Sequence, residues 1–325
     1  MAPTLQELLG SPDHYLHSFE GSDALFVPMD RAAYRRSIFL DRRIAAAREG
    51  VLRVPASVLA DAPAPLPTNW IFHIAHCGST LLARALDELG PGIVLREPLA
   101  LRQLALLPEP GPLLVPTLGL LSRRYPGAGT TLIKANVPVN FMLGPMLAAM
   151  PQARAIFLYA KLPEYLCAVL RSDNHCRWVR GVTEVLAGQL GTELPDGDAE
   201  RAAMLWQAQL SRFAEAMPQA GAARSLDFDA FLIHPAETLA ACAELFGQVV
   251  DRAAVDKVCT GPLFSTYAKN PAVAFDNQTR LSIRAAALQA LAGEITAAQR
   301  WLDRRDCDHE ALCASVAQAD LLSGR

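Results

Sequence analysis

The sequence lacks an excess of basic residues and a long apolar run, and each absence excludes a class of protein. Thirty Lys and Arg against 33 Asp and Glu give a formal charge of −3, which argues against an extended nucleic-acid or anionic membrane surface. No apolar run reaches the length of a membrane span, and the first residues contain no basic segment followed by an apolar stretch. We therefore expect no membrane span and no signal peptide.

The sequence also lacks a paired cysteine pattern. Its seven cysteines are scattered and odd in number, which argues against a disulfide framework and fits reduced thiols in the cytoplasm. With 325 residues, of which 51% are hydrophobic, the chain can bury a substantial core. We expect one large globular domain with an appendage and a cytoplasmic location.

Strand-like and helix-like segments alternate along the first half of the chain. A proline-rich stretch at 61–67 separates an N-terminal extension, residues 1–66, from a main domain, residues 67–325. Apolar strand-like runs at 69–74, 93–95, 130–134 and 153–159 alternate with helical patterns, an order that requires parallel crossover connections. The prediction is an α/β fold with a parallel sheet between helices, followed from residue 163 by a helix-rich C-terminal half.

The most informative stretch, residues 69–84, reads as a strand, a tight loop and a helix. Such a loop turns backbone N–H groups inward, and the helix N-terminus adds partial positive charge, so phosphate or sulfate is the natural ligand. Gly78 would allow close approach of an anion, and Ser79 and Thr80 would offer hydroxyls. The stretch is not a Walker A loop, because His73 and Ser79 occupy the places of its first Gly and its Lys. The alternative is an ordinary strand-to-helix turn with a Ser/Thr helix start.

Residues 75–82, Ala-His-Cys-Gly-Ser-Thr-Leu-Leu, resemble a loop of the PAPS-dependent sulfotransferases, where PAPS is 3′-phosphoadenosine-5′-phosphosulfate. That loop, commonly Pro-Arg-Ser-Gly-Thr-Thr-Leu-Leu, holds the 5′-phosphosulfate. The resemblance implies a P-loop-type fold and PAPS as cofactor. Within the family, the sequence resembles the branch of tyrosylprotein and carbohydrate sulfotransferases. His76 stands where the family has Arg or Lys, and Cys77 where it has Ser. The implied cofactor-binding residues of the loop are His76, Cys77, Gly78, Ser79 and Thr80.

The same resemblance assigns catalytic roles to two residues that end strand-like runs. Glu97 corresponds to the family's catalytic base, since a carboxylate at the sheet rim can accept the proton of an acceptor hydroxyl. Lys134 corresponds to the lysine that stabilises charge on the leaving phosphate, an electrostatic role that needs no metal. The alternatives are a structural acid paired with Arg96 or Arg102, and a solvated strand-end lysine.

Two further segments resemble cofactor contacts of the family. Residues 263–270 are similar to a C-terminal Ser-then-Lys loop, which makes Ser265 a catalytic candidate and Lys269 a phosphate ligand. For the 3′-phosphate, Lys161 would replace the family's Arg, while Val169 stands where the family has Ser. Ser172 would supply a further contact, and other candidates for phosphate are Arg171, Arg177, Arg180 and Arg280.

The first hypothesis is a PAPS-dependent sulfotransferase that acts on a hydroxyl of a small-molecule or peptide acceptor, with no metal and no nucleic-acid partner. The alternative is a protein of the same fold that binds another phosphorylated nucleotide or anion, as a phosphotransferase-like enzyme or a noncatalytic binding module. The acceptor pocket is expected from residues 100–125 and 172–200, because variable helices and loops shape such pockets.

Overall fold

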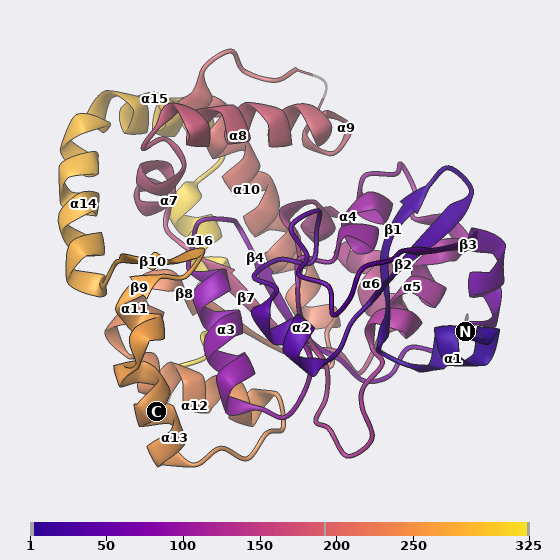
Figure 1. Cartoon of the computed structure of the whole chain (residues 1–325). Helices are drawn as coiled ribbons and strands as arrows, with labels where there is room; N and C mark the ends of the chain where they lie inside the picture. Colours follow the sequence, from indigo (N-terminus) through magenta and orange to yellow (C-terminus); the bar gives the residue numbers. More distant parts are fainter. Residues whose placement is uncertain (1–2, 192, 324–325) are drawn as a thin grey trace.

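A five-stranded parallel sheet forms the centre of the protein (Figure 1). The computed structural model describes residues 3–191 and 193–323. The strands lie in the order β5 (Val94–Arg96), β6 (Leu132–Lys134), β4 (Asn69–His73), β7 (Arg154–Tyr159) and β8 (Ala222–Asp227). Every neighbouring pair is parallel. All five residues of β4 are buried, as expected for a sheet covered on both faces, and the predicted α/β class is confirmed.

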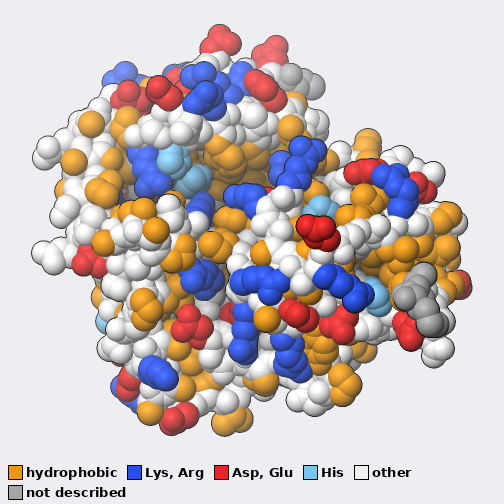
Figure 2. Space-filling view, in the orientation of Figure 1, with side chains coloured by type: hydrophobic (Ala, Val, Ile, Leu, Met, Phe, Trp, Pro, Cys, Tyr) orange, Lys and Arg blue, Asp and Glu red, His pale blue; other side chains and the backbone are white. Residues whose placement is uncertain are grey.

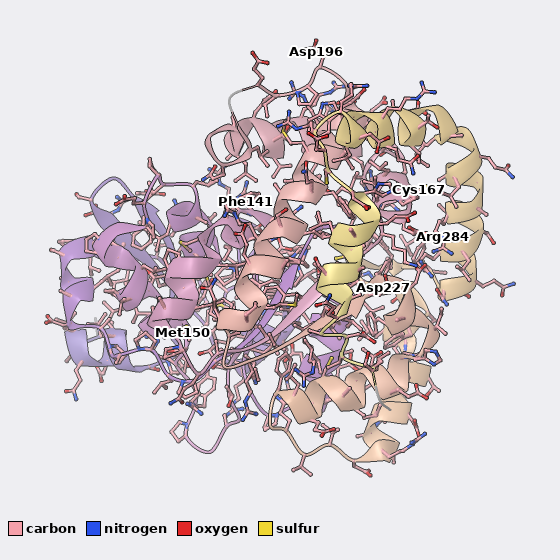
Figure 3. All side chains as sticks on the ribbon, turned by 180° about the vertical axis from the view of Figure 1, so that it is seen from behind. Phe141, Met150, Cys167, Asp196, Asp227 and Arg284 are labelled. Atoms are coloured by element: carbon pink, nitrogen blue, oxygen red, sulfur yellow. The ribbon has the colours of Figure 1, made fainter. Side chains whose placement is uncertain are left out.

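Helices make the connections between the strands. The segment α3 (Ser79–Leu89) follows β4, and α4 (Leu99–Ala105), the 3₁₀ turn η2 (Gly111–Leu113) and α5 (Leu114–Leu121) follow β5. The 3₁₀ turn η3 (Val137–Met142) and α6 (Leu143–Ala149) follow β6. Between β7 and β8 come α7 (Leu162–Val169), α8 (Asp173–Val185), α9 (Ala187–Leu190), α10 (Asp198–Ala216) and η4 (Met217–Gln219). The view from behind shows α10 crossing the face of the sheet opposite to α3 (Figure 3).

The strand order places a crevice at the carboxyl end of β4. The chain leaves β4 toward β5 and β6 on one side and later crosses to β7 on the other. In open parallel sheets, ligands bind where the connections diverge in this way, outside the carboxyl ends of the strands. The loop after β4 lies at this point.

The N-terminal extension forms a small antiparallel sheet packed on the main domain. Its strands are β1 (His14–Glu20), β2 (Asp23–Pro28) and β3 (Leu52–Pro55), and its helical segments are α1 (Leu5–Gly10), α2 (Arg31–Arg36) and η1 (Ala56–Asp61). Arg123 of the main domain is buried and donates hydrogen bonds to the carbonyls of Leu8, Leu9 and His14. A cluster of buried apolar side chains joins the extension to α4 and α5 through Ala100 and Leu120.

The C-terminal part contains a hairpin and three final helices. After β8 come α11 (Phe228–Ile233), α12 (Pro235–Leu245), α13 (Arg252–Thr260) and η5 (Pro262–Phe264), then β9 (Thr266–Tyr267) and β10 (Asn270–Ala274). The last helices are α14 (Asn277–Ala290), α15 (Ala292–Asp303) and α16 (His309–Ala317). The sequence pattern predicts a loop to residue 280 and one helix over 281–300. The helix instead begins at Asn277, because the Asp276 side chain accepts a hydrogen bond from Thr279 N at 2.7 Å and caps it.

Within the described residues, no helix is both long enough and apolar enough to cross a membrane. All seven cysteines are free thiols.

Candidate functional site

The loop between β4 and α3 has an unusual backbone conformation. Ala75, His76 and Gly78 all have positive φ, at 69°, 51° and 76°. Residues in the left-handed region turn successive N–H groups toward one side of the chain, and such a concave array binds anions. Helix α3 then begins at Ser79 with no side-chain cap, so its first N–H groups have no partner within the helix. The loop and the helix start together form a cradle of N–H groups whose geometry suits an anion.

The structure gives reasons for glycine at position 78 beyond the predicted one. Close approach of an anion to Gly78 stays a prediction, and a Cβ at this position would lie 2.2 Å from Cε2 of the Phe228 ring. The position therefore needs glycine because of its φ of 76° and because Phe228, at the start of α11, packs against it. A side chain at residue 78 would displace that ring.

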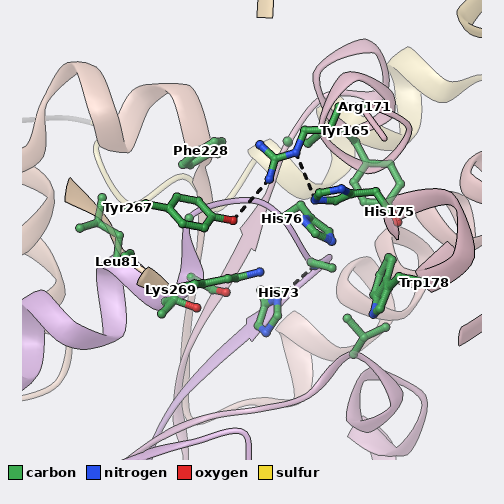
Figure 4. Close-up of a pocket in the computed structure, with 18 of the residues that line it drawn as sticks. His73, His76, Leu81, Tyr165, Arg171, His175, Trp178, Phe228, Tyr267 and Lys269 are labelled. Atoms are coloured by element: carbon green, nitrogen blue, oxygen red, sulfur yellow. Dashed lines mark hydrogen bonds between the residues drawn. The ribbon is translucent and has the colours of Figure 1, made fainter. Parts of the chain in front are cut away.

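The cradle opens into a cavity of about 800 Å³ at the carboxyl ends of β4, β5 and β6. Lys, Arg and His side chains gather around a hollow on this face of the molecule (Figure 2). The close-up shows His76 beside His175 and Trp178, with Arg171 next to His175 and with Lys269 and His73 nearer the strand ends (Figure 4). The loop and α3 contribute Ala75, His76, Gly78, Ser79, Thr80 and Leu81, and the strand ends contribute His73, Glu97, Lys134 and Asn136.

Glu97 and Lys134 form an ion pair at the base of the cavity. The Lys134 ammonium donates a hydrogen bond to Oε1 of Glu97. Lys134 is 1% exposed, and burial lowers its pKa, while the Glu97 carboxylate acts in the opposite direction. Glu97 has a φ of 59°, a strained conformation for this residue type, and its N–H is bound to the Lys134 carbonyl at 2.8 Å. Two adjacent strand ends thus hold the carboxylate and the ammonium in the cavity wall.

His73 is a buried positioning residue that the sequence interpretation does not identify. Its Nδ1 accepts a hydrogen bond from Ala75 N at 3.0 Å, so the proton is on Nε2, which donates to the Ala135 carbonyl at 2.9 Å. Burial and the nearby Lys134 hold its pKa well below the ordinary value. The neutral ring fixes the first left-handed residue of the loop. The sequence signal was available, since His73 ends the buried strand before the loop.

The loop position at which the family has a cation carries an uncharged ring. Burial holds the pKa of His76 well below its usual value, with Lys269 and His175 acting in the same direction. The His76 ring lies against His175 and Trp178, with ring centroids 4.9 and 5.0 Å apart. His76 is therefore neutral at pH 7, and positive charge must come from elsewhere.

Arg171 supplies positive charge across the mouth of the cavity. Its Nε donates to Nε2 of His175 at 3.1 Å, and its Nη2 reaches the Tyr267 hydroxyl at 3.4 Å (Figure 4). Burial lowers the pKa of His175 to about 4, with Arg171 and Lys269 as further causes. A contact therefore runs from the end of α7 to the β9–β10 hairpin, which also carries Lys269 into the cavity lining.

Helix α14 adds two more arginines. Arg280 and Arg284 both bind the carboxylate of Asp229 on α11, the first at 2.6 Å and the second also in hydrogen-bond contact. The Arg280 guanidinium stacks over the Phe228 ring, 5.1 Å from its centroid. Its Nη2 is buried and has no hydrogen-bond partner among the described residues. This donor is free to meet a ligand.

Three uncharged polar atoms of cavity-lining residues are also buried without a hydrogen-bond partner within the described part of the chain. They are Thr80 Oγ1, Asn136 Oδ1 and the Tyr165 hydroxyl. Buried polar atoms in folded proteins nearly always have partners, so each such atom calls for an explanation. The two hydroxyls can donate to a bound anion, whereas Asn136 Oδ1 can only accept from a donor group of a ligand.

Four residues predicted for the site do not line the cavity. Cys77 is buried beneath the loop, its Sγ donates to the Leu158 carbonyl at 3.6 Å, and burial raises its pKa to about 12. Ser265 donates to the Pro262 carbonyl at 3.3 Å, and its neighbour Thr266 lines the cavity instead. Lys161 is exposed at the N-terminus of α7. Ser172 binds Nδ1 of His175 at 2.6 Å and reaches the site only through that ring.

Several predicted residues do line the cavity together, namely Glu97, Lys134, His76, Gly78, Ser79, Thr80 and Lys269. Of the further phosphate candidates, Arg177 binds Asn174 and Arg180 binds Asp198, both at exposed positions. Within residues 3–191 and 193–323, there is no group of three or more His, Cys, Asp or Glu side chains arranged to hold a metal ion.

The solved structures similar to this chain include two sulfotransferases. The sulfotransferase domain from the curacin biosynthetic pathway is 11% identical with a TM-score of 0.44, and the match covers 75% of this chain and 99% of that domain. A sulfotransferase from Alicyclobacillus acidocaldarius is 14% identical with a TM-score of 0.35, covering 73% and 98%. No family model matches the sequence, and no curated protein matches it. At these TM-scores the likeness says nothing of activity, which depends on the residues of the site.

Proposed function

We propose that the protein is a sulfotransferase that moves the sulfuryl group of PAPS to a hydroxyl of an acceptor, with Glu97 as general base. The observation that carries this proposal is the Glu97–Lys134 pair beside an anion-binding cradle. One group can accept a proton and the other can stabilise a leaving oxygen, while the cradle holds an anion close to both. Bound PAPS would supply the activated sulfuryl group.

The two strand-end residues have unused hydrogen-bonding capacity suited to this reaction. Glu97 Oε1 is bound to Lys134, whereas Oε2 makes no hydrogen bond among the described residues and can accept the proton of the acceptor. An ammonium group has three N–H donors, and Glu97 takes one of those of Lys134. The remaining donors can reach an oxygen that develops negative charge.

In this proposal each bond change of the transfer would be served by a named residue. The acceptor oxygen would form a bond to sulfur while Oε2 of Glu97 accepted its proton. The bond between sulfur and the bridging oxygen would break, with the electron pair kept by that oxygen in the departing adenosine 3′,5′-bisphosphate (PAP). Lys134 and the N–H groups of Ser79 and Thr80 would stabilise the charge on its 5′-phosphate.

The residues present fit a donor with a second phosphate. Lys269, Arg171 and the unpartnered Nη2 of Arg280 lie around one cavity, so a 3′-phosphate has cations to meet although His76 is neutral. The unpartnered Thr80 hydroxyl can donate a further hydrogen bond to a phosphate oxygen.

Calorimetry with PAP, 5′-AMP, ADP and Mg-ATP tests the proposal. Charge-assisted contacts contribute about 1.5–3 kcal/mol each, so PAP should bind at least roughly tenfold more tightly than 5′-AMP. Lys269→Gln should remove much of that preference. The control Arg252→Gln alters an exposed arginine of α13, outside the cavity, and should leave it unchanged.

The variant Lys161→Gln tests whether the nucleotide site includes Lys161 or is confined to the residues that line the cavity. If the sequence-based assignment holds, this variant loses PAP affinity, whereas a site confined to the cavity lining leaves it unaffected. Equal affinity for PAP and 5′-AMP in the unaltered protein, or a Mg-dependent preference for ATP, would instead support the alternative, a protein that binds another phosphorylated nucleotide or anion.

A further inference from the structure

The cavity extends past Glu97 to a wall made by the N-terminal extension. Phe39, Asp41 and Arg43 line it, and they follow α2 in a segment that hydrogen bonds hold beside β5. Lys134 Nζ lies 5.7 Å from the centroid of the Phe39 ring, and the Arg43 guanidinium stacks on the same ring at 3.8 Å. These residues are therefore neighbours of the proposed reaction centre, on the side that the anion-binding loop does not occupy.

Arg102 of α4 completes this wall, and its side chain makes no hydrogen bond or ion pair within the described part of the chain. Arg43 binds the Asp41 carboxylate through Nε at 2.9 Å. Arg102 lines the same cavity, and its charge acts on Asp41 from a distance and, after the hydrogen bonds from Arg43, helps to lower the pKa of that carboxyl. An arginine in a cavity wall without a counter-ion favours binding of an anion.

The charges near the reaction centre leave a positive surplus. Arg43, Arg102 and Lys134 carry positive charge, and Asp41 and Glu97 carry negative charge. The Asp41 and Glu97 carboxylates are bound by Arg43 and Lys134, so Arg102 is the cation of this group left unneutralised. In a partly buried site, such a charge is screened less than on an open surface.

Helix α8 and η3 give the cavity an apolar wall. Trp178, Val182 and Val185 of α8 recur at helical spacing on the side that faces the cavity, and Val137 and Pro138 of η3 join them. Trp178 and Val182 pack on the buried cluster that includes Ala75 and Val137. Val185 is nonetheless 51% exposed, which leaves apolar surface in contact with water. The α8 wall can cover an extended apolar group.

We propose that the acceptor is an amphipathic hydroxyl compound, with an apolar body on the α8 wall and a carboxylate or similar anionic group at Arg102. The proposal rests on the sulfotransferase function, because it names the acceptor of that same site. Arg102 binds the anionic group, the α8 wall binds the apolar body, and together they bring a hydroxyl to Glu97. The N-terminal extension thus supplies part of the acceptor site.

Binding of matched probes tests this proposal without any sulfuryl donor. The probes are a long-chain hydroxy fatty acid, its methyl ester and glycolate, each measured by calorimetry with the full chain. The acid should bind roughly tenfold more tightly than the ester, since a charge-assisted contact to arginine is lost in the ester. Glycolate should bind much more weakly than the long-chain acid, because it has no apolar body.

Variants test separately the role of Arg102 in binding the anionic group and the role of the α8 wall in binding the apolar body. Arg102→Gln should remove the preference for acid over ester, Val182→Ser should weaken both long-chain probes, and Arg252→Gln should change neither. PAP affinity should be unchanged in Arg102→Gln, which also shows that this variant is folded.

The outcomes separate the two proposals. If PAP binds but acid and ester bind equally or not at all, the acceptor proposal is overturned while the sulfotransferase function stands. If the acid binds through Arg102 but PAP does not bind, the anionic acceptor site stands and the sulfotransferase function fails.

Discussion

At the scale of single residues, the site is built from side chains whose charge states are set by burial. Buried Lys134 pairs with the partly exposed Glu97, whereas His73, whose Nε2 lies 4.0 Å from Oε1 of Glu97, and His76 are held neutral. Neutral rings beside a cationic group avoid like-charge repulsion while leaving the lysine as the charged donor. The left-handed backbone of Glu97 adds a geometric constraint that keeps its carboxylate at the rim.

The first prediction concerns Glu97→Gln. The amide keeps the shape of the side chain and a carbonyl oxygen that can accept a hydrogen bond from Lys134, but it cannot accept the acceptor's proton. Turnover should fall by about 10²–10⁴ while PAP affinity changes little. Steady-state rates with calorimetry in parallel check this. Unchanged turnover would assign Glu97 a structural role only.

The second prediction concerns pH. Because the pKa of His175 is about 4 in the fold against 6.5 when unperturbed, the unfolded chain binds more protons between these values. The free energy of unfolding should therefore fall as pH drops below about 6.5, and part of that fall should be missing in His175→Asn. Urea titrations at several pH values measure it. If the free energy of unfolding depends on pH identically in the variant and the unaltered protein, the His175 ring is not held neutral by the fold.

At the scale of elements, α14 is held over the cavity by few contacts. None of its residues is buried, and Arg280 and Arg284 on its inner side both bind Asp229 of α11. A helix with no buried residue derives little stability from packing, so these charge-assisted contacts carry much of its attachment.

The third prediction follows for Asp229→Asn. Loss of the shared carboxylate weakens two charge-assisted contacts of about 1.5–3 kcal/mol each, so amide hydrogen exchange in α14 should accelerate at least roughly tenfold. Exchange in β4 and α10 should be unaffected. Asp303→Asn, an exposed position on α15, is the matched control. Equal exchange in the two variants would show that α14 is held by other contacts.

At the scale of the whole molecule, the sequence is most informative where local pattern decides the structure. Buried strand runs, the loop after β4 and the strand-end positions of Glu97 and Lys134 depend on residues close in sequence. The contribution of Phe39, Asp41 and Arg43 depends on a long-range docking of the extension, which no local pattern encodes. The neutrality of His76 likewise depends on burial by α8.

That docking depends on Arg96 at the end of β5. Its side chain is 1% exposed and is bound to the Asp87 carboxylate at 2.7 Å. It also donates to the carbonyls of Tyr34, Arg35 and Ser37, while its own carbonyl accepts from Leu40 N at 2.8 Å. One residue thus joins the strand that precedes Glu97 to the segment that carries Phe39, Asp41 and Arg43, the cavity wall that we propose as part of the acceptor site and call the acceptor wall.

The last prediction concerns Arg96→Met. The change leaves the Asp87 carboxylate buried without its partner and three carbonyls without their donor, so the free energy of unfolding should fall by about 3–5 kcal/mol. Trypsin should then cut faster at the arginines of residues 35–43, because that segment loses its attachment to β5. PAP affinity should persist in the folded protein, since the anion-binding loop lies on other strands. Adding Asp87→Leu should restore part of the stability by removing the unpaired charge. Wild-type protection of residues 35–43 from trypsin in Arg96→Met would show that the apolar contacts of the extension alone hold the acceptor wall in place.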